Sequence, residues 1–115
     1  MKIYRWDQVL KEQMNPSIAR QVIHGEKMTV AKVYLAKGGV VPLHSHVNEQ
    51  LTVLERGRLR FQVGGEEVYL EPGNVLQIPP DAPHQVEALE DSVAMDLFSP
   101  AREDWIRGDD AYLRR

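Results

Sequence analysis

Between Ile18 and Phe98, the apolar residues occur in short runs that Gly, Pro or Asn residues separate. This spacing is typical of many short strands and leaves no room for long helices. The sequence therefore predicts an all-β fold. The expected strands cover residues 19–23, 29–36, 50–55, 59–63, 67–70, 75–78, 84–88 and 93–98.

Three residue pairs are the strongest turn signals within this region: Gly38-Gly39, Gly64-Gly65 and Pro72-Gly73. Glycine adopts a positive φ without steric cost and proline presets a negative one, so each pair suits a tight turn. Because Gly64-Gly65 separates two strand-like runs directly, it predicts a two-residue hairpin.

The two ends of the chain lack this pattern. A chain of 115 residues has the size of one domain, so we expect a single domain over residues 1–115 with its core at about 18–98. The first residues mix aromatic and charged side chains without alternation. We expect three of them to pack against the outside of this β domain: Ile3, Trp6 and Val9.

Residues 99–115 are expected to form a C-terminal helical tail. Ser99 would be the N-cap and Pro100 the first helical residue, because serine caps a helix N-terminus and proline fits its first position. The short helix would end at Gly108.

Charge balance and cysteine content exclude several classes of partner and site. The chain has 14 Lys and Arg against 17 Asp and Glu, a net charge of -3, so we expect no nucleic-acid partner. No apolar run approaches the roughly 20 residues of a spanning helix, so we expect no membrane association and a cytoplasmic location. With no cysteine in the chain, a metal must be bound by imidazole, carboxylate or amide oxygen.

His44 and His46 lie two residues apart in the segment VVPLHSHVNEQLTVL. In an extended chain alternate side chains share one face, so both imidazoles can point into one cavity. The same parity would bring Gln50 to that face, unless the intervening VNE residues form a turn that breaks it. A His-x-His pair is equally compatible with an ordinary polar surface, so these residues alone leave the metal site open.

His84 ends the segment GNVLQIPPDAPH, in which a glycine turn, an apolar strand and a proline-rich loop precede a single histidine. Proline fixes φ and costs no ladder hydrogen bond at a strand edge, so this loop presents His84 with little conformational freedom. Such rigidity suits a metal ligand. His24, in VIHGEK, lies outside both histidine segments, and we expect it to be a surface turn residue.

The two histidine segments resemble the two sequence motifs of the cupin family. The matching positions are Gly38, His44, His46, Gln50 and Gly57 in the first motif, and Gly73, Pro79, Asp81 and His84 in the second. The resemblance implies the cupin double-stranded β-helix, a jelly-roll barrel with one divalent metal on His44, His46, His84 and Gln50. Two positions depart from the family pattern, which has Glu at Gln50 and Gly at Asp81.

Gln50 makes the protein ligand set uncharged. A neutral set donates less charge, so it should bind metal less tightly and leave the ion more electrophilic, which favours Lewis-acid chemistry over storage. The alternative is a site that has lost its metal. Imidazole and amide oxygen do not select one ion, so Ni, Fe, Co, Mn and Zn are all candidates.

Most of the chain also resembles the small pectin-degradation cupins, which convert 4,5-unsaturated uronate monosaccharides from pectin or alginate to linear 5-keto forms. The likeness lies in SIARQVIHGEKMTVAKVYLAKGGVVP, HSHVNEQLTVLERGRLRFQVGGEE and MDLFSPAREDWIRGDDAYLR. In that group a His, His, Gln, His metal set is usual, and an Asp-x-Phe pattern, matched by Asp96 and Phe98, is functional. The resemblance implies an isomerase-like enzyme of uronate metabolism.

Strand alternation places Ala94, Asp96 and Phe98 on one face. Asp96 is the candidate acid/base, because a carboxylate near the metal can move the proton that ketonisation requires. Phe98 would shape the pocket against the sugar ring. The alternative for Asp96 is a strand-end residue that only bonds the backbone.

The substrate carboxylate requires a cation, and the planar fork of arginine can contact both of its oxygens. Arg102 is the leading candidate, with Arg60 or Arg58 as substitutes only if their strand face points inward. Two other functions stay open. One is a different metal cupin enzyme such as an oxygenase, which Gln50 disfavours, and the other is a binding cupin without turnover. We expect a homodimer, because pairing would cover the exposed sheet edges of a small sandwich.

Overall fold

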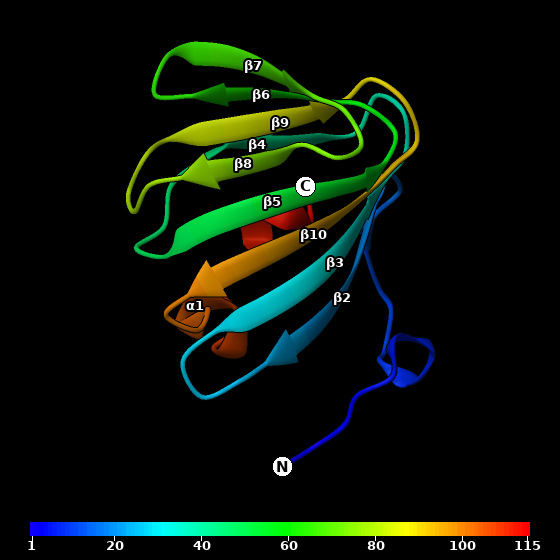
Figure 1. The fold of residues 1–115 in the computed structure, drawn as a ribbon, viewed down its shortest axis with the longest axis vertical. Coiled ribbons are helices and arrows are strands. Elements are labelled where there is room, and N and C mark those ends of the chain that lie inside the picture. The colour runs from blue at the N-terminus through cyan, green and yellow to red at the C-terminus, as the bar shows by residue number, and fades with distance from the viewer.

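The computed structural model covers residues 1–115 and places two antiparallel sheets face to face (Figure 1). The larger sheet has the strand order β1-β2-β3-β10-β5-β8, and the smaller has the order β4-β9-β6-β7. The strands are β1 (Glu12–Asn15), β2 (Ile18–His24), β3 (Thr29–Leu35), β4 (Val40–His44), β5 (Glu49–Arg56), β6 (Leu59–Val63), β7 (Glu66–Leu70), β8 (Val75–Ile78), β9 (His84–Ala88) and β10 (Ser92–Ser99). The all-β expectation is confirmed.

All eight expected strands are present, with ends that differ from the expectation by at most one residue. The sequence pattern missed β1 and β4. β1 is short and mostly polar, and β4 contains Pro42, which lacks the N–H of a central strand. β4 is an edge strand of the smaller sheet, where proline costs no ladder hydrogen bond.

The core lies between the inner faces of the two sheets. Leu54, Leu59 and Ile78 are among its fully buried side chains, and each comes from an inward-facing position of its strand. Burial of this apolar surface drives the two sheets together, at about 25 cal/mol for each Å² removed from water. The packed sheets therefore form a rigid frame for the polar residues at one end.

Two glycine positions have a backbone requirement. Gly64 and Gly65 connect β6 to β7 with φ values of 55° and 86°, as a type I′ hairpin requires, so the predicted two-residue turn is confirmed. At Gly57 a Cβ atom would lie 2.2 Å from Oγ of Ser92, so only glycine fits against that residue.

The N-terminal segment departs from the expectation. Ile3 is 90% exposed, so its predicted packing is wrong, and Trp6 and Val9 are only half-buried. Gln21 holds the segment instead, because its Nε2 donates to the carbonyl oxygens of Trp6, at 2.7 Å, and Val9, at 2.9 Å. A short 3-10 helix, η1 (Trp6–Gln8), lies between these contacts.

The C-terminal helix α1 (Glu103–Ile106) begins later than predicted. Ser99 is not its N-cap, because it pairs with Glu49 as the last residue of β10 and the chain cannot turn into a helix there. The N-cap is Arg102. Gly108 follows the end of the helix with a positive φ, as expected, and a second 3-10 helix, η2 (Ala111–Leu113), completes the tail. None of these helices has the length and apolar character that a membrane-spanning helix requires.

Candidate metal centre

Three histidines converge at one end of the barrel. His44 and His84 are directly opposite each other in the pairing of β4 with β9, and His46 follows in the loop after β4. The ring centroids lie 4.2 Å apart for His44 and His84, 5.0 Å for His46 and His84, and 5.7 Å for His44 and His46. One ring nitrogen from each lies within 4.8 Å of the others, a spacing that fits ligation of a single cation.

Each imidazole has its Nδ1 atom next to a backbone carbonyl oxygen. The partners are Pro42 for His44 at 2.8 Å, Asn48 for His46 at 3.0 Å and Ala82 for His84 at 2.8 Å. A carbonyl only accepts, so each neutral ring carries its proton on Nδ1 and presents an unprotonated Nε2 to the cavity. This hydrogen bond from the far side of the ring is typical of metal-binding histidines.

Gln50 adds a fourth acceptor to the same space. Its side-chain Oε1 lies 3.0 Å from Nε2 of His46, and Nε2 of His84 is buried without any hydrogen-bond partner. Two lone pairs that face each other without a proton repel, and a cation between them removes the repulsion. The residues present therefore fit a divalent metal bound by His44, His46, His84 and Gln50.

Burial keeps these imidazoles neutral. Desolvation lowers the pKa of His44 and of His46 to about 4, and the positive charge of Arg102 adds to the effect at both. The pKa of His84 is lowered for the same main reason. Because metal binds the neutral ring, this environment favours a metal over a proton at neutral pH.

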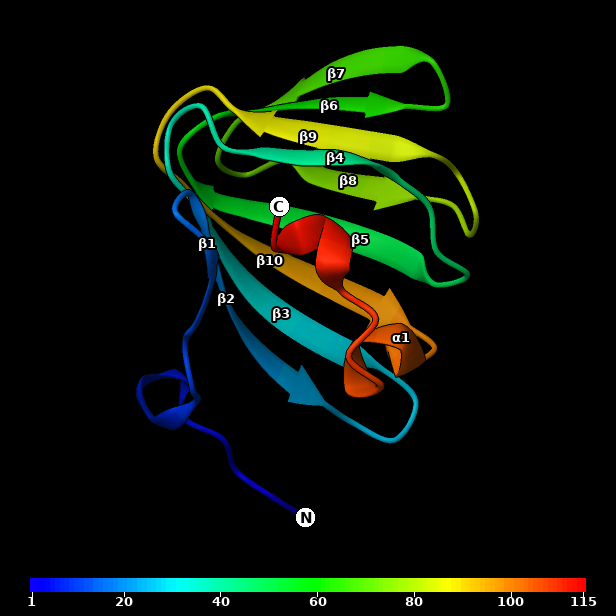
Figure 2. The same ribbon diagram turned by 180° about the vertical axis from the view of Figure 1, so that it is seen from behind.

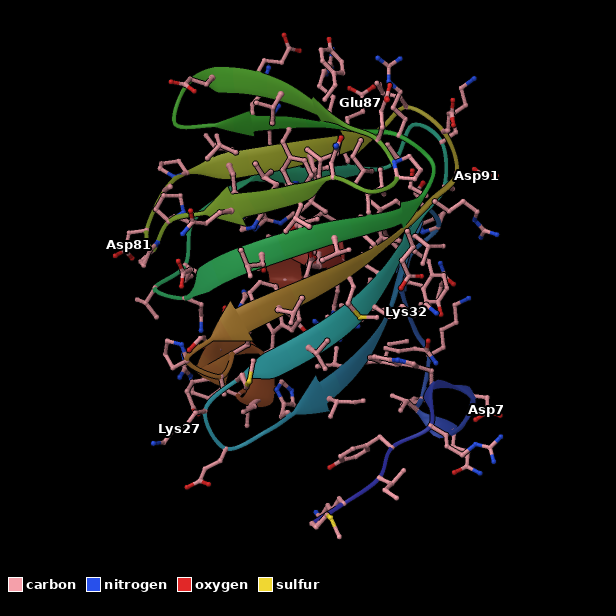
Figure 3. All side chains as sticks on the ribbon, viewed as in Figure 1. Asp7, Lys27, Lys32, Asp81, Glu87 and Asp91 are labelled. Atoms are coloured by element: carbon pink, nitrogen blue, oxygen red, sulfur yellow. The ribbon has the colours of Figure 1, made fainter.

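The loop after β4 is held in place by the loop before β9. The backbone N–H of Asp81 donates to the carbonyl oxygen of His46 at 2.8 Å, and Asp81 has a φ of 64° (labelled in Figure 3). Asparagine and aspartate tolerate this left-handed conformation better than other residues with a side chain. This explains how Asp81 can occupy a position that is glycine in the motif.

The parity argument for Gln50 gave the right face for the wrong reason. The chain bends at Val47 and Asn48, so the alternation that begins at His44 does not continue. Gln50 faces inward because β5 has its own register, in which Gln50 is opposite Phe98 of β10.

Asp96 and Phe98, both on β10, line one pocket together with His44, His84 and Gln50. Desolvation raises the pKa of Asp96 to about 6, although Thr52 donates a hydrogen bond to its Oδ1 at 2.6 Å. The buried Phe98 ring packs edge-on against His46, with centroids 5.6 Å apart, and against Trp105 at 5.2 Å. A carboxyl whose pKa lies near neutrality can both donate and accept a proton, as an acid/base group must.

Arg102 also lines this pocket, but its guanidinium is already partly engaged. Its Nε and Nη2 donate to the two carboxylate oxygens of Asp104 at 2.9 and 2.8 Å, and Nη2 also donates to the hydroxyl of Tyr112. The expected two-pronged grip on a substrate carboxylate is therefore not available on that edge. Only Nη1 has no protein acceptor.

Arg60 does not reach the pocket. Its guanidinium pairs with Glu87 and Glu67 on the outer face of the smaller sheet, where Figure 3 labels Glu87. Arg58 similarly pairs with Glu71 and lies over the ring of Tyr69. The condition that either strand face points inward is not met. His24, as expected, is exposed beside the turn between β2 and β3.

The tail supplies pocket residues that no sequence pattern indicated. Tyr112 stacks on the ring of His44 with centroids 4.6 Å apart, and its hydroxyl accepts from Nε1 of Trp105 at 3.1 Å. Arg20 of β2 binds Asp110 at 2.6 Å, which ties the tail to the larger sheet. Figure 2 shows the C-terminal segment between the two sheets. No spacing signal in the tail could have indicated that these residues turn back over the barrel.

Comparison with known proteins gives matches along most of the chain. The pectin degradation protein KdgF of Dickeya dadantii is 28% identical over 103 residues, which cover 87% of this chain and 94% of that protein. The solved structure of KdgF from Halomonas sp. has a TM-score of 0.85 and 28% identity, and covers 91% of this chain and 98% of that one. A solved RmlC-like cupin from Shewanella frigidimarina has a TM-score of 0.85 and 24% identity, and covers 91% and 96%.

A comparison with protein families matches residues 31–99 to the cupin domain. The match includes all three converging histidines, Gln50 and Asp96, and the structural likeness to KdgF confirms the jelly-roll barrel that the two motifs imply. Since the matched residues make up more than half of its length, this chain belongs to the cupin domain family.

Proposed function

We propose that this chain is a metal-dependent enzyme that converts 4,5-unsaturated uronate monosaccharides to their linear 5-keto forms. The observation that carries the proposal is the combination within one pocket of a neutral cluster of metal-ligand atoms and a carboxyl, Asp96, with a pKa raised to about 6. The likeness to two KdgF proteins, one of them named for pectin degradation, supports the substrate class.

The reaction is an isomerisation, so no second substrate is needed. The ring of the unsaturated uronate contains a C4=C5 enol ether, and opening at C1 leaves an aldehyde and an enol at C5. Transfer of a proton to C4 converts that enol to the ketone. The proton gained at C4 is balanced by the one lost from the hydroxyl on C1.

His44, His46, His84 and Gln50 would hold a divalent metal, which would supply a Lewis acid for the sugar oxygens and for enolate charge. Asp96 is the residue that moves the proton. Thr52 occupies its Oδ1, so we assign Oδ2 to the transfer. With a pKa of about 6, the carboxyl is a strong enough base to take a proton near neutral pH and a strong enough acid to return it to C4.

Two further side chains bind and orient the sugar. Nη1 of Arg102 is the donor we assign to the substrate carboxylate, since the rest of that guanidinium is taken by Asp104 and Tyr112. Phe98 forms an apolar wall beside His46, against which one face of the ring can pack. Both residues line the same pocket as Asp96, and Phe98 lies on the same strand.

The direct test is to add metal-loaded protein to 4,5-unsaturated galacturonate and to follow the loss of ultraviolet absorbance from the conjugated C4=C5 bond. Formation of the linear ketone is checked by nuclear magnetic resonance. We expect faster loss than in buffer, abolished by a chelator and restored by metal. Protein that binds metal and sugar but gives no acceleration over buffer would instead be a binding cupin.

A further inference from the structure

One buried polar residue beside the pocket transfers no proton and binds no substrate in the proposed reaction. Thr52 lies on β5 two residues after Gln50, directly opposite Asp96 of β10, and is 1% exposed. Burial of a hydroxyl costs free energy unless its hydrogen bonds are satisfied. The hydrogen-bond partners of Thr52 therefore indicate what a polar residue does at this position.

Thr52 connects the metal-ligand amide to the acid/base carboxylate. Nε2 of Gln50 donates to Oγ1 of Thr52 at 2.9 Å, and Oγ1 donates to Oδ1 of Asp96 at 2.6 Å. A threonine hydroxyl has one proton, and a carboxylate oxygen only accepts. Because that proton points to Asp96, Thr52 can only accept from Gln50.

This polarity fixes the rotation of the Gln50 amide. With Nε2 committed to Thr52, Oε1 is the end that faces Nε2 of His46 at 3.0 Å. An amide rotated by half a turn would present N–H groups to the cation, and N–H groups cannot serve as ligands. We propose that Thr52 is a positioning residue, which makes Gln50 a metal ligand by holding its oxygen toward the three histidines.

The first test is the metal affinity of Thr52→Val, measured without substrate by calorimetry with Zn²⁺ and by the visible spectrum of bound Co²⁺. Valine keeps the shape of threonine and removes only the hydroxyl. We expect a 10- to 100-fold rise in Kd, about the cost of removing a partner that orients a metal ligand, and an altered Co²⁺ spectrum. Thr52→Ser should restore both.

Thr29→Val is the matched control. Thr29 is an equally buried strand threonine, and its hydroxyl bonds the backbone N–H of Arg102 and the ring of His24 rather than a ligand. Its loss should leave the Kd for Zn²⁺ within about twofold. An equal loss of affinity in Thr29→Val would reveal a general effect of burying valine and would overturn the inference.

The sharper test repeats the change in a Gln50→Glu background. Both ends of a glutamate are oxygens, so rotation no longer matters and Thr52→Val should raise Kd by less than about threefold there. A purely structural role of Thr52 predicts the same loss in both backgrounds, which would refute the proposal. Thr52→Ala in the same cycle serves if the valine variants do not fold, as judged by circular dichroism.

The inference rests on the metal site of the proposed function but not on its substrate. If wild-type protein binds neither Zn²⁺ nor Co²⁺, the metal site itself is wrong and the inference about Thr52 fails with it. If wild type binds metal and Thr52→Val binds it equally well with an unchanged spectrum, only the role of Thr52 is wrong. Absence of uronate turnover leaves the affinity measurements and their meaning intact.

Discussion

The pocket has two walls of opposite chemistry. The histidine wall, made of His44, His84 and Gln50 with His46 beside them, comes from the barrel and presents only lone pairs to the interior. The tail wall, made of Arg102, Trp105 and Tyr112, comes from the C-terminal segment and carries a buried positive charge. In the histidine wall the ring protons are bonded away from the pocket, and in the tail wall Nη1 of Arg102 has no protein acceptor.

This difference shows what each wall can bind. Converging acceptors without protons favour a cation, whereas an arginine nitrogen with free N–H groups favours an anion. A metal and a carboxylate substrate can therefore enter one small pocket without competing for the same groups. Asp96 lines the same pocket, and burial raises the pKa of its carboxyl, so it binds a proton more readily than an exposed aspartate does.

Loss of one histidine should have the largest effect. In His84→Ala the metal loses a ligand that is fixed by the carbonyl of Ala82, so we expect Kd to rise by more than about 100-fold, beyond the cost of losing an orienting partner, and turnover to vanish. Elemental analysis after dialysis and calorimetry measure the loss. His24→Ala, at the exposed end of β2, is the control and should bind metal normally. Full metal retention by His84→Ala would contradict the histidine wall.

Asp96→Asn should separate chemistry from metal binding. Asparagine still accepts the hydrogen bond of Thr52 but cannot take up and return a proton, so kcat should fall by about 10²- to 10⁴-fold. The Kd for metal should change by less than about threefold, because the amide still satisfies the same partner. Initial rates on the unsaturated uronate check this, with the exposed Asp7→Asn as control (labelled in Figure 3). Turnover close to wild type would remove Asp96 from the proton transfer.

Arg102→Lys tests the tail wall alone. Lysine keeps the charge but cannot bind Asp104 through two nitrogens and still present a third to substrate, so KM should rise by about 10- to 100-fold while metal affinity stays unchanged. Steady-state kinetics and calorimetry measure the two quantities. Arg107→Lys, an exposed change in the same segment, is the matched control. A loss of metal in Arg102→Lys would show that the two walls are not independent.

A fall in pH should change the stability contributions of the histidines and of Asp96 in opposite directions. The folded-state pKa values of His44 and His46, about 4, lie below the usual 6.5, so their contribution to stability is present above pH 6.5 and is lost as the pH falls toward 4. Asp96 has a raised pKa, so its contribution is present below pH 3.8 and is lost as the pH rises through about 6.

Asp96→Asn should consequently raise the free energy of unfolding above pH 7, by on the order of 2 kcal/mol, and change it little near pH 4. Urea titrations of metal-free protein at both pH values measure the difference. Equal effects at the two pH values would mean that the negative charge on Asp96 does not destabilise the folded protein.

Much of the fold was predictable because its signals are local. Strand residues alternate with a period of two, and turns such as Gly64-Gly65 depend on backbone freedom within two positions. The failures have equally local causes. Pro42 argued against a strand at β4, because the edge position that tolerates proline is a property of the whole sheet. Ser99 and Pro100 matched the pattern of a helix start, but pairing of Ser99 with Glu49 extends β10 instead.

The sequence by itself determined the types of the candidate ligands and the order of the two histidine motifs, since residue identity and spacing are properties of the chain. The tertiary structure decided what these residues do. Antiparallel pairing places His44 opposite His84 in the smaller sheet and Thr52 opposite Asp96 in the larger one. The C-terminal tail folds back, so that Tyr112 stacks on His44 and bonds Arg102. Such contacts depend on burial and on partners distant in sequence, which set both the pKa of Asp96 and the orientation of the Gln50 amide.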